Sequence, residues 1–196
     1  MTRVHLVRHG QVHNPQRRVY GRLPGWHLSD KGREQAEKVA RSLAGRTIAA
    51  LYSSPLERAR ETSEILARTL RLPVQVREDL IESALAAQWE GLSWPRVWTE
   101  RFREWQTYRK RPLEMDCPEP LVRLGERMSA AVRGLAADHP GQEIVVVSHG
   151  DPIKAAALAL TGGDLGRLHE ERLPTGGRIT LDLAADGTAV RVEKEP

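Results

Sequence analysis

Two histidines stand in the same local pattern, one near each end of this 196-residue chain. His9 in LVRHG and His149 in VVVSHG each follow an apolar run typical of a buried strand, and each precedes a glycine. In α/β sheets, ligands bind beyond the carboxyl ends of the strands, so the two side chains meet in one crevice if their strands are neighbours. A neutral imidazole in such a crevice can act as a nucleophile.

Two arginines are placed to complete the same crevice. Arg8 directly precedes His9, and Arg58 falls in the first turn of a predicted helix in SSPLERARET. A helix N-terminus offers free backbone N–H groups and a partial positive charge, both of which favour phosphate. Phosphoryl transfer needs a neutral nucleophile and several fixed donors for the phosphoryl oxygens. Each signal is weak alone, but together they indicate phosphoryl transfer.

The elements that must position these residues alternate in type along the chain. Short apolar runs alternate with longer segments of helical periodicity, which predicts an α/β fold with a largely parallel sheet. Ser54 is the expected N-cap of the second helix and Pro55 its first residue. The predicted strands cover 4–7, 48–52, 74–76 and 143–147, and a closing hairpin 179–183 and 190–192. A first helix of about 14 residues is expected after a cap at Ser29 or Asp30, and further helices cover 55–70, 119–137 and 152–160.

A tryptophan-rich stretch at 84–112 interrupts this alternation. It holds four of the five tryptophans, and the pattern from Pro95 to Tyr108 looks helical. Two interpretations are open: an amphipathic helix packed on the main sheet, or a lid over the active site that helps to choose substrates. The chain is expected to form a single domain over 1–196, with an inserted helical region at about 84–138. The helix would place four apolar residues on one face: Val97, Trp98, Phe102 and Trp105.

Composition and charge exclude several classes of protein. Hydrophobic residues make up 40% of the chain, and no apolar run approaches the roughly 20 residues that would span a bilayer. The net charge of +4 comes from arginines interleaved with acidic residues, rather than from the clustered basic stripe typical of nucleic-acid binding. Cys117 is the only cysteine, and the first residues lack a signal-peptide pattern. We therefore expect a cytoplasmic protein that binds neither membranes nor nucleic acid; a homodimer is left open.

Five segments together resemble the histidine phosphatase superfamily, in particular its phosphoglycerate mutase-like branch. They are LVRHGQ, LSDKG ending at Gly32, SSPLERARET, LIES with WEGLSW, and VVVSHG. The resemblance covers nearly the whole chain. It implies a three-layer α/β/α sandwich whose mostly parallel sheet has one antiparallel edge strand. It also implies hydrolysis of a small phosphomonoester, without metal or other cofactor, through a phosphohistidine.

The resemblance also assigns roles to residues of this chain. His9 corresponds to the phosphorylated nucleophile, and Arg8, Arg58 and His149 to the phosphate pocket. Glu82, in the LIES segment, corresponds to the proton donor.

Three further residues are assigned with less support from the motifs. Asn14 lies one residue short of the usual phosphate-contacting asparagine, and Gly21 lies in the stretch that shapes the substrate side. Asp151 is an alternative acid, but the intervening Gly150 gives it a poor spacing for that role. The chain also has Gln11 and Val12 where the family often has Glu and then Thr or Ser.

Two other functions remain open at this stage. A cofactor-dependent phosphoglycerate mutase shares the catalytic centre, but the stretch ESALAAQWEGLSW lacks the Tyr, Asn and Lys usual in such mutases. A non-catalytic module that binds a phosphorylated ligand or a protein would keep the fold without turnover. The pocket residues and the acid are all present, so the residues favour an enzyme.

Overall fold

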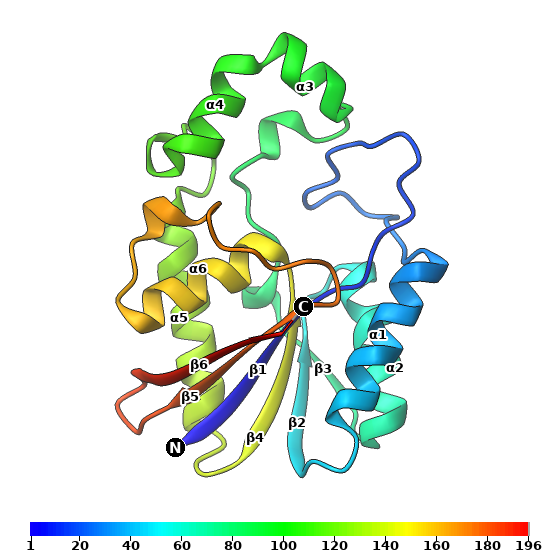
Figure 1. The fold of residues 1–196 in the computed structure, drawn as a ribbon, viewed down its shortest axis with the longest axis vertical. Helices are drawn as coiled ribbons and strands as arrows, with labels where there is room; N and C mark the ends of the chain where they lie inside the picture. Colours follow the sequence, from blue (N-terminus) through cyan, green and yellow to red (C-terminus); the bar gives the residue numbers. More distant parts are fainter. Residues whose placement is uncertain (196) are drawn as a thin grey trace.

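The computed structural model describes residues 1–195, which form one six-stranded sheet with helices on both faces (Figure 1). The strand order is β3-β2-β4-β1-β5-β6. The four strands from β3 to β1 pair in parallel, which confirms the mostly parallel sheet. Their bounds, with those of the last two strands, are β1 Thr2–Arg8, β2 Ile48–Ser53, β3 Val74–Val76, β4 Glu143–Ser148, β5 Arg178–Leu183 and β6 Ala189–Glu195.

The antiparallel strand is not at the edge of the sheet, where we expected it. β5 pairs antiparallel with β1, and β6 pairs antiparallel with β5. The closing hairpin places its first strand against β1, so the reversed strand lies one position inside the sheet. The edge strand β6 therefore runs in the same direction as β1.

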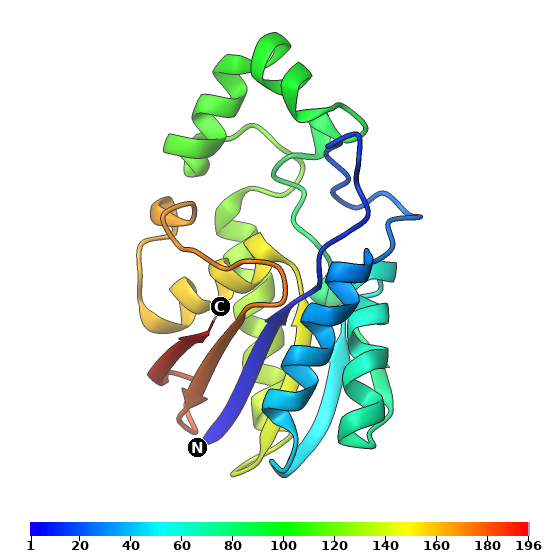
Figure 2. The ribbon, with the colours of Figure 1, turned by 45° about the vertical axis from the view of Figure 1, so that its right-hand side comes forward.

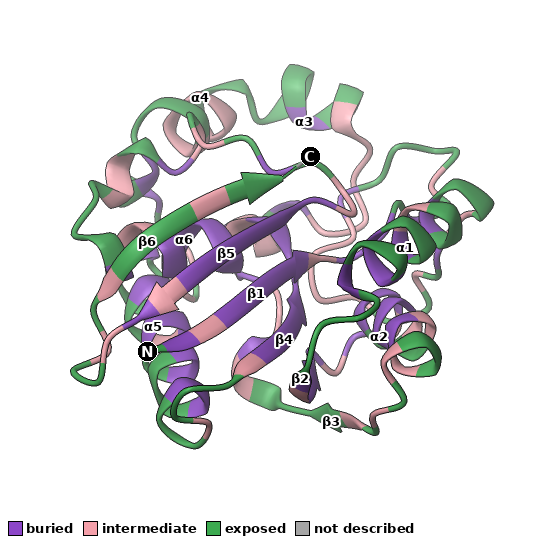
Figure 3. Ribbon diagram, turned by 60° about the horizontal axis from the view of Figure 1, so that its bottom comes forward, coloured by how far each residue is buried: buried purple, intermediate pink, exposed green. Residues whose placement is uncertain are grey.

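The three predicted layers are confirmed. Helices α1 (Asp30–Leu43) and α2 (Glu57–Leu70) cover one face of the sheet, and α5 (Leu121–Ala137) and α6 (Gly150–Thr161) cover the other (Figure 2). The β-branched strand β4 shows how both faces become core, because successive side chains of a strand point to opposite faces. Ile144 and Val146 join the α5–α6 side, whereas Val145 and Val147 join the α1–α2 side. The central strands are accordingly buried along most of their length (Figure 3).

The two helices that precede the site begin differently. α1 begins after Ser29, one of the two expected caps, whose side chain accepts a hydrogen bond from the Gly32 amide. α2 begins at Glu57, after an uncapped Leu56, and not at Pro55. The expected cap, Ser54, points its hydroxyl at His149 instead, with the oxygen 2.7 Å from His149 Nε2.

The tryptophan-rich stretch forms a separate small layer, which we call the cap (residues 84–117). It contains α3 (Trp94–Glu100) and α4 (Phe102–Lys110), with a break at Arg101 where one continuous helix was expected. Its helices α3 and α4 lie beyond the carboxyl ends of the strands (Figure 1), while Leu85, Tyr108 and Cys117 connect the cap to the main core. Its own core consists of Trp89, Val97 and Met115 together with Val19.

The break at Arg101 changes which apolar side chains are buried. Val97 is fully buried, whereas Trp98 and Phe102 are 41% and 49% exposed, so the four residues do not share a buried face. The region predicted at 84–138 therefore divides in two, because α5 belongs to the layer on the sheet. Among residues 1–195, no helix is long and apolar enough to cross a membrane.

Candidate functional site

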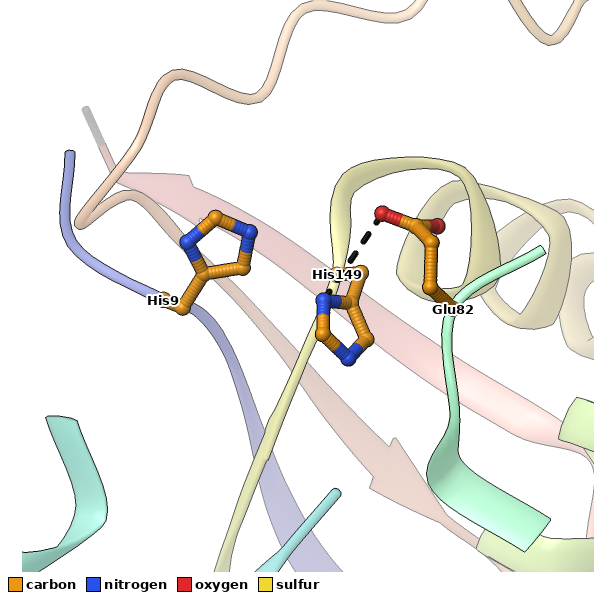
Figure 4. Close-up of side chains that lie close together, drawn as sticks. All are labelled: His9, Glu82 and His149. Carbon is orange, nitrogen blue, oxygen red and sulfur yellow. Dashed lines mark ion pairs between the residues drawn. The ribbon is translucent and has the colours of Figure 1, made fainter. Parts of the chain in front are cut away.

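The two strand-end histidines meet because β1 and β4 are neighbours, as the sequence required. Arg8 lies opposite Ser148 in the register of the two strands, and the His9 amide donates to the Ser148 carbonyl at 3.1 Å. The imidazole centroids are 5.1 Å apart, with the rings inclined at 62°. Both side chains are buried, and Glu82 approaches them from a third segment (Figure 4).

His9 is held with one ring nitrogen aimed at the site. Its Nδ1 lies 2.8 Å from the Gly10 carbonyl oxygen, which can only accept, so Nδ1 carries the proton and Nε2 has the lone pair. Burial, reinforced by the Arg58 and Arg8 charges, holds the pKa of His9 well below its ordinary value. The imidazole is therefore neutral near pH 7, with Nε2 available as a nucleophile.

Gly10 allows the loop after His9 to pack closely against helix α1. A Cβ at position 10 would lie 2.2 Å from the Gly32 carbonyl oxygen, and a Cβ at Gly32 would lie 2.0 Å from the Gln11 carbonyl oxygen. The loop after His9 is thus locked to α1 by two glycines. The Gly10 amide also donates to Thr62 of α2 at 3.1 Å.

Arg58 is fully buried and reaches the nucleophile from the second residue of α2. Its Nε lies 3.3 Å from His9 Nε2, and its Nη2 donates to the Gly21 carbonyl at 2.6 Å. The guanidinium also lies 4.8 Å from the centre of the Tyr20 ring. Arg8 is fixed by a 2.6 Å hydrogen bond from its Nη1 to the Leu173 carbonyl.

Three buried donors of this cluster have no hydrogen-bond partner among the described residues: Arg8 Nε, Arg58 Nη1 and His149 Nδ1. An unpaired buried donor costs about 1–3 kcal/mol, so three around one histidine demand an explanation. Gly150 permits the arrangement, because a Cβ there would lie 3.2 Å from the Arg8 guanidinium carbon. Such a donor set fits the oxygens of a tetrahedral anion.

The surroundings of His149 favour the tautomer with its proton on Nδ1. Ser54 Oγ lies 2.7 Å from Nε2 and can donate its hydroxyl proton there, while it accepts from the Leu56 amide at 3.4 Å. Nδ1 faces an acceptor, the Glu82 carboxylate, at 3.7 Å and has no hydrogen-bond partner among the described residues. Burial, with the Arg58 charge second, holds the pKa of His149 well below its ordinary value. His149 is therefore a neutral donor, and the fixed positive charge comes from the arginines.

Glu82 is the carboxyl group nearest to both imidazoles. One oxygen lies 3.7 Å from His149 Nδ1 and 3.9 Å from Arg58 Nη2, while the other accepts from the Ser83 amide at 2.8 Å. Burial raises the pKa of the Glu82 carboxyl above its ordinary value, although the nearby Arg58 charge opposes the shift. A group in this state can hold a proton and deliver it.

The carboxylate of Asp151, the alternative acid, is bound by other side chains. Its two oxygens bind the Tyr108 hydroxyl of the cap and the Lys154 ammonium, each at 2.9 Å. Burial alone would raise the pKa of Asp151, but Lys154, His169 and the Tyr108 hydroxyl outweigh it and hold this pKa below its ordinary value. Asp151 is therefore ionised and hydrogen-bonded, which favours Glu82 as the acid.

The structure separates the two remaining predicted site residues. The Asn14 side chain does not reach the pocket, because its amide closes a turn on the backbone N–H and C=O of Arg18, at 2.9 and 2.8 Å. Gly21 does line the pocket and contributes its carbonyl, the acceptor that fixes Arg58. Its φ of +38° is left-handed, and a Cβ there would collide with the Glu90 carboxylate.

A pocket of about 240 Å³ opens over this cluster, between the sheet and the cap. Of the groups described above, Arg8, Glu82, Gly150 and Asp151 line it, and its outer wall is partly aromatic. The cap contributes Trp94 and Tyr108, and the loop after β1 contributes Tyr20. Residues of the cap therefore line the outer side of the pocket, where a lid would lie.

A metal ion is the other ligand to consider, because His9, Glu82 and His149 offer ligand atoms within 4.8 Å of one another. Three ligands of these types could hold zinc. However, the guanidinium of Arg58 lies against His9 Nε2, the nitrogen that would bind the ion, and it cannot be deprotonated. The charges of Arg8 and Arg58 favour an anion at this place.

Fold and site together define an α/β protein in which imidazole and guanidinium groups with unpartnered donors gather where the parallel strands end. The chain belongs to the histidine phosphatase superfamily, because residues 4–195 match its branch 1. It is a phosphoric monoester hydrolase of that superfamily.

Three relatives illustrate the match. Phosphoserine phosphatase 1 of Hydrogenobacter thermophilus is 32% identical over 171 residues, which cover 85% of this chain and 80% of that protein. The protein Rv0525 of Mycobacterium tuberculosis is 43% identical over 168 residues, covering 82% and 79%. The structure of a mycobacterial glucosyl-3-phosphoglycerate phosphatase in complex with inorganic phosphate superposes with a TM-score of 0.83. It is 25% identical and covers 99% of this chain and 95% of that one.

Some residues that build the site could not be read from the sequence. The sequence predicts a helix cap for Ser54 and only the end of a helical stretch for Tyr108. Arg22 lies in the same stretch as Gly21, expected either to shape the substrate side or to pack as a surface loop, and it donates to the Glu82 carbonyl at 2.7 Å. The only local signal for Ser54 is its place in SSPLERARET, two residues after the predicted strand at 48–52.

Proposed function

We propose that this phosphatase hydrolyses a small phosphomonoester in two steps through a phosphohistidine on His9, without a metal ion. The observation that carries the proposal is the set of three unpartnered donors around a neutral, correctly oriented imidazole. These groups match the needs of phosphoryl transfer, in which charge spreads over the equatorial oxygens.

In the first step, His9 Nε2 attacks phosphorus and the ester P–O bond breaks. Arg8, Arg58 and the Nδ1–H of His149 hold the phosphoryl oxygens, so the positive charge that a metal supplies in other enzymes comes from guanidinium groups. Glu82 donates its proton to the departing alcohol oxygen.

In the second step, the Glu82 carboxylate takes a proton from a water molecule, whose oxygen attacks phosphorus. The P–N bond to His9 breaks, inorganic phosphate leaves, and both side chains return to their starting protonation states. A single carboxyl group therefore serves as acid and then as base, which its raised pKa suits.

The substrate is proposed to be a small phosphorylated metabolite whose alcohol part contacts the cap. The pocket volume of about 240 Å³ and its Trp94 and Tyr108 lining support this. The relatives named for phosphoserine and for glucosyl-3-phosphoglycerate support the same class of compound.

The test uses 4-nitrophenyl phosphate with and without a chelator. We expect phosphate release to be unaffected by the chelator, and rapid quenching with labelled substrate to trap an acid-labile phosphoprotein. The His9→Ala variant should form no labelled protein. Loss of turnover with the chelator, or labelling of the variant, would overturn the proposal. Exchange of 2- and 3-phosphoglycerate without phosphate release would point to a mutase.

A further inference from the structure

The acid Glu82 lies in a segment with little regular structure of its own. Residues 81–86 connect two short 3₁₀ helices, Glu78–Leu80 and Ala87–Trp89, and contribute no strand to the sheet. General acid catalysis depends on the distance between the carboxyl oxygen and the leaving oxygen, and misplacement by about 1 Å can lower a rate 10²-fold. Something outside the segment must therefore hold it.

The segment is held by a three-residue cluster that we call the clamp: Arg22, Glu119 and Arg127. Glu119 lies just before α5, and its side chain is 15% exposed. Its carboxylate binds Arg127 through two hydrogen bonds of 2.6 and 3.1 Å, and it accepts from Arg22 Nη2 at 2.7 Å. One carboxylate thus fixes two arginines that come from distant parts of the chain.

The clamp contacts the backbone on both sides of the acid. Arg127 Nη1 donates to the carbonyls of Asp79 and Ile81 at 2.7 and 3.1 Å. Arg22 Nε donates to the carbonyl of Glu82 itself at 2.7 Å, and Glu119 accepts from the amide of Ala84 at 3.2 Å. Four backbone groups between residues 79 and 84 therefore depend on the clamp.

We infer that Glu119 is a positioning residue that sets the place of the Glu82 carboxyl relative to the leaving oxygen. The inference rests on the proposed function, because it assumes that Glu82 is the proton donor. Glu119 does not line the pocket and so acts through the backbone of the acid segment. Without its charge, two arginines lose their shared partner and the contacts to Asp79, Ile81 and Glu82 loosen together.

The test compares two substrates that differ in their need for a proton. Dinitrophenolate leaves without protonation, whereas the alkoxide of benzyl phosphate must be protonated as it leaves. The measured quantity is kcat/KM, because it reports the step in which the ester bond breaks. For Glu119→Gln we expect a loss of about tenfold or more on benzyl phosphate and less than about threefold on 2,4-dinitrophenyl phosphate. Inhibition by inorganic phosphate should change by less than about twofold, because the anion pocket is intact.

Glu114→Gln is the matched control, since Glu114 pairs with Arg111 on the exposed surface of the cap. It should leave both substrates unaffected. An equal loss on both substrates in Glu119→Gln, or no loss on either, would overturn the inference. If Glu119→Gln does not fold, Arg22→Lys takes its place. Lysine keeps the positive charge but lacks the second nitrogen, with which arginine reaches the Glu82 carbonyl as well as the Glu119 carboxylate. Arg22→Lys must then show the same selective loss.

Glu82→Gln separates this inference from the proposed function. It should show the selective loss on benzyl phosphate more strongly than Glu119→Gln. If Glu82→Gln is selective and Glu119→Gln is not, only the positioning role of Glu119 fails. If Glu82→Gln shows no selectivity, the acid of the proposed function is wrong and the inference falls with it.

Discussion

The two ends of the sheet use the same residue types in opposite ways. At the amino end, Arg3 binds Asp182 through two hydrogen bonds of 2.7 Å, and Glu143 binds Arg46 at 2.7 and 2.9 Å. His5 adds a contact of 3.1 Å to Glu143. At the carboxyl end, the arginines and histidines keep buried donors without partners. The charged groups of the amino end pair with one another, whereas those of the carboxyl end keep donors free for the phosphoryl group of the proposed substrate.

The two glutamates show how geometry decides the outcome. Hydrogen bonds from Arg46 lower the pKa of Glu143 to about 2, against the effect of burial. Glu82 also has an arginine and a histidine nearby, but at 3.9 and 3.7 Å, and there burial prevails and raises its pKa. Contacts of 2.7–3.1 Å at Glu143, against 3.7–3.9 Å at Glu82, thus separate an ion pair with a lowered pKa from a carboxyl group with a raised one.

The strongest test of this comparison uses two buried histidines, His5 within β1 and His9 just after its end. His9→Ala should lower kcat/KM by at least about 10⁴-fold, because the nucleophile is lost. Its free energy of unfolding should change by less than about 1 kcal/mol, because the ring lies between two arginine charges that it does not neutralise. Turnover and urea unfolding measure the two quantities.

His5→Ala should show the reverse pattern. The ring bridges Thr180 and Glu143, so its loss should cost about 2–3 kcal/mol of stability while turnover of the folded protein stays within about twofold. A stable but inactive His5→Ala protein, or an active His9→Ala protein, would contradict the division between the two ends.

The next largest effect concerns the pH dependence of Glu82. The acid must be protonated, so kcat/KM should fall as the pH rises through the raised pKa of Glu82. On the acid side, activity should persist below the ordinary histidine range, because the pKa of His9 is held low and the imidazole stays neutral. Glu82→Gln should lower the benzyl phosphate plateau by about 10²–10³-fold.

The shape of the profile provides the check on that assignment. In Glu82→Gln, the fall of kcat/KM at high pH that comes from deprotonation of Glu82 should disappear. The low-pH side of the profile should be unchanged. A variant that keeps the full alkaline fall would show that another group supplies the proton. Asp151→Asn would then be the variant to measure, because Asp151 is the other carboxyl group that lines the pocket.

Much of the fold was predictable because its signals are local. The β-branched run in β4 and the cap of α1 each act within a few residues; the strand is confirmed, and the cap is Ser29, one of the two residues expected there. The errors arose where a distant contact overrides the local pattern. Ser54 reads as a cap, but its hydroxyl is used by a histidine 95 residues away. The position of the antiparallel strand depends on which strand of the hairpin pairs with β1, which periodicity does not report.

The residues of the site likewise divide into those that local signals predict and those that distant contacts place. Arg8, His9, Arg58 and His149 lie at strand ends or a helix start, and the parallel sheet brings such positions together. The clamp was not predictable, because Arg22, Glu119 and Arg127 are common surface residue types, and Arg22 and Glu119 are 97 residues apart. Asn14 fails for a local reason, since its amide closes its own turn.

The smallest expected effect lies at the amino end, in the pH dependence of stability. The folded pKa of Glu143 is about 2, below the ordinary 4.5 of the unfolded chain. Its ion pair therefore stabilises the fold fully above pH 4.5, and the contribution is lost as the pH falls towards 2. Because Glu143 and Arg46 are 28% and 36% exposed, solvent screening reduces the contribution to about 1–2 kcal/mol.

Urea unfolding of wild type and Glu143→Gln should show this difference at neutral pH and a smaller one in acid. An equal difference at both pH values would mean that the carboxylate charge at this end of the sheet does not stabilise the fold, and the contrast with Glu82 would rest on the active site alone.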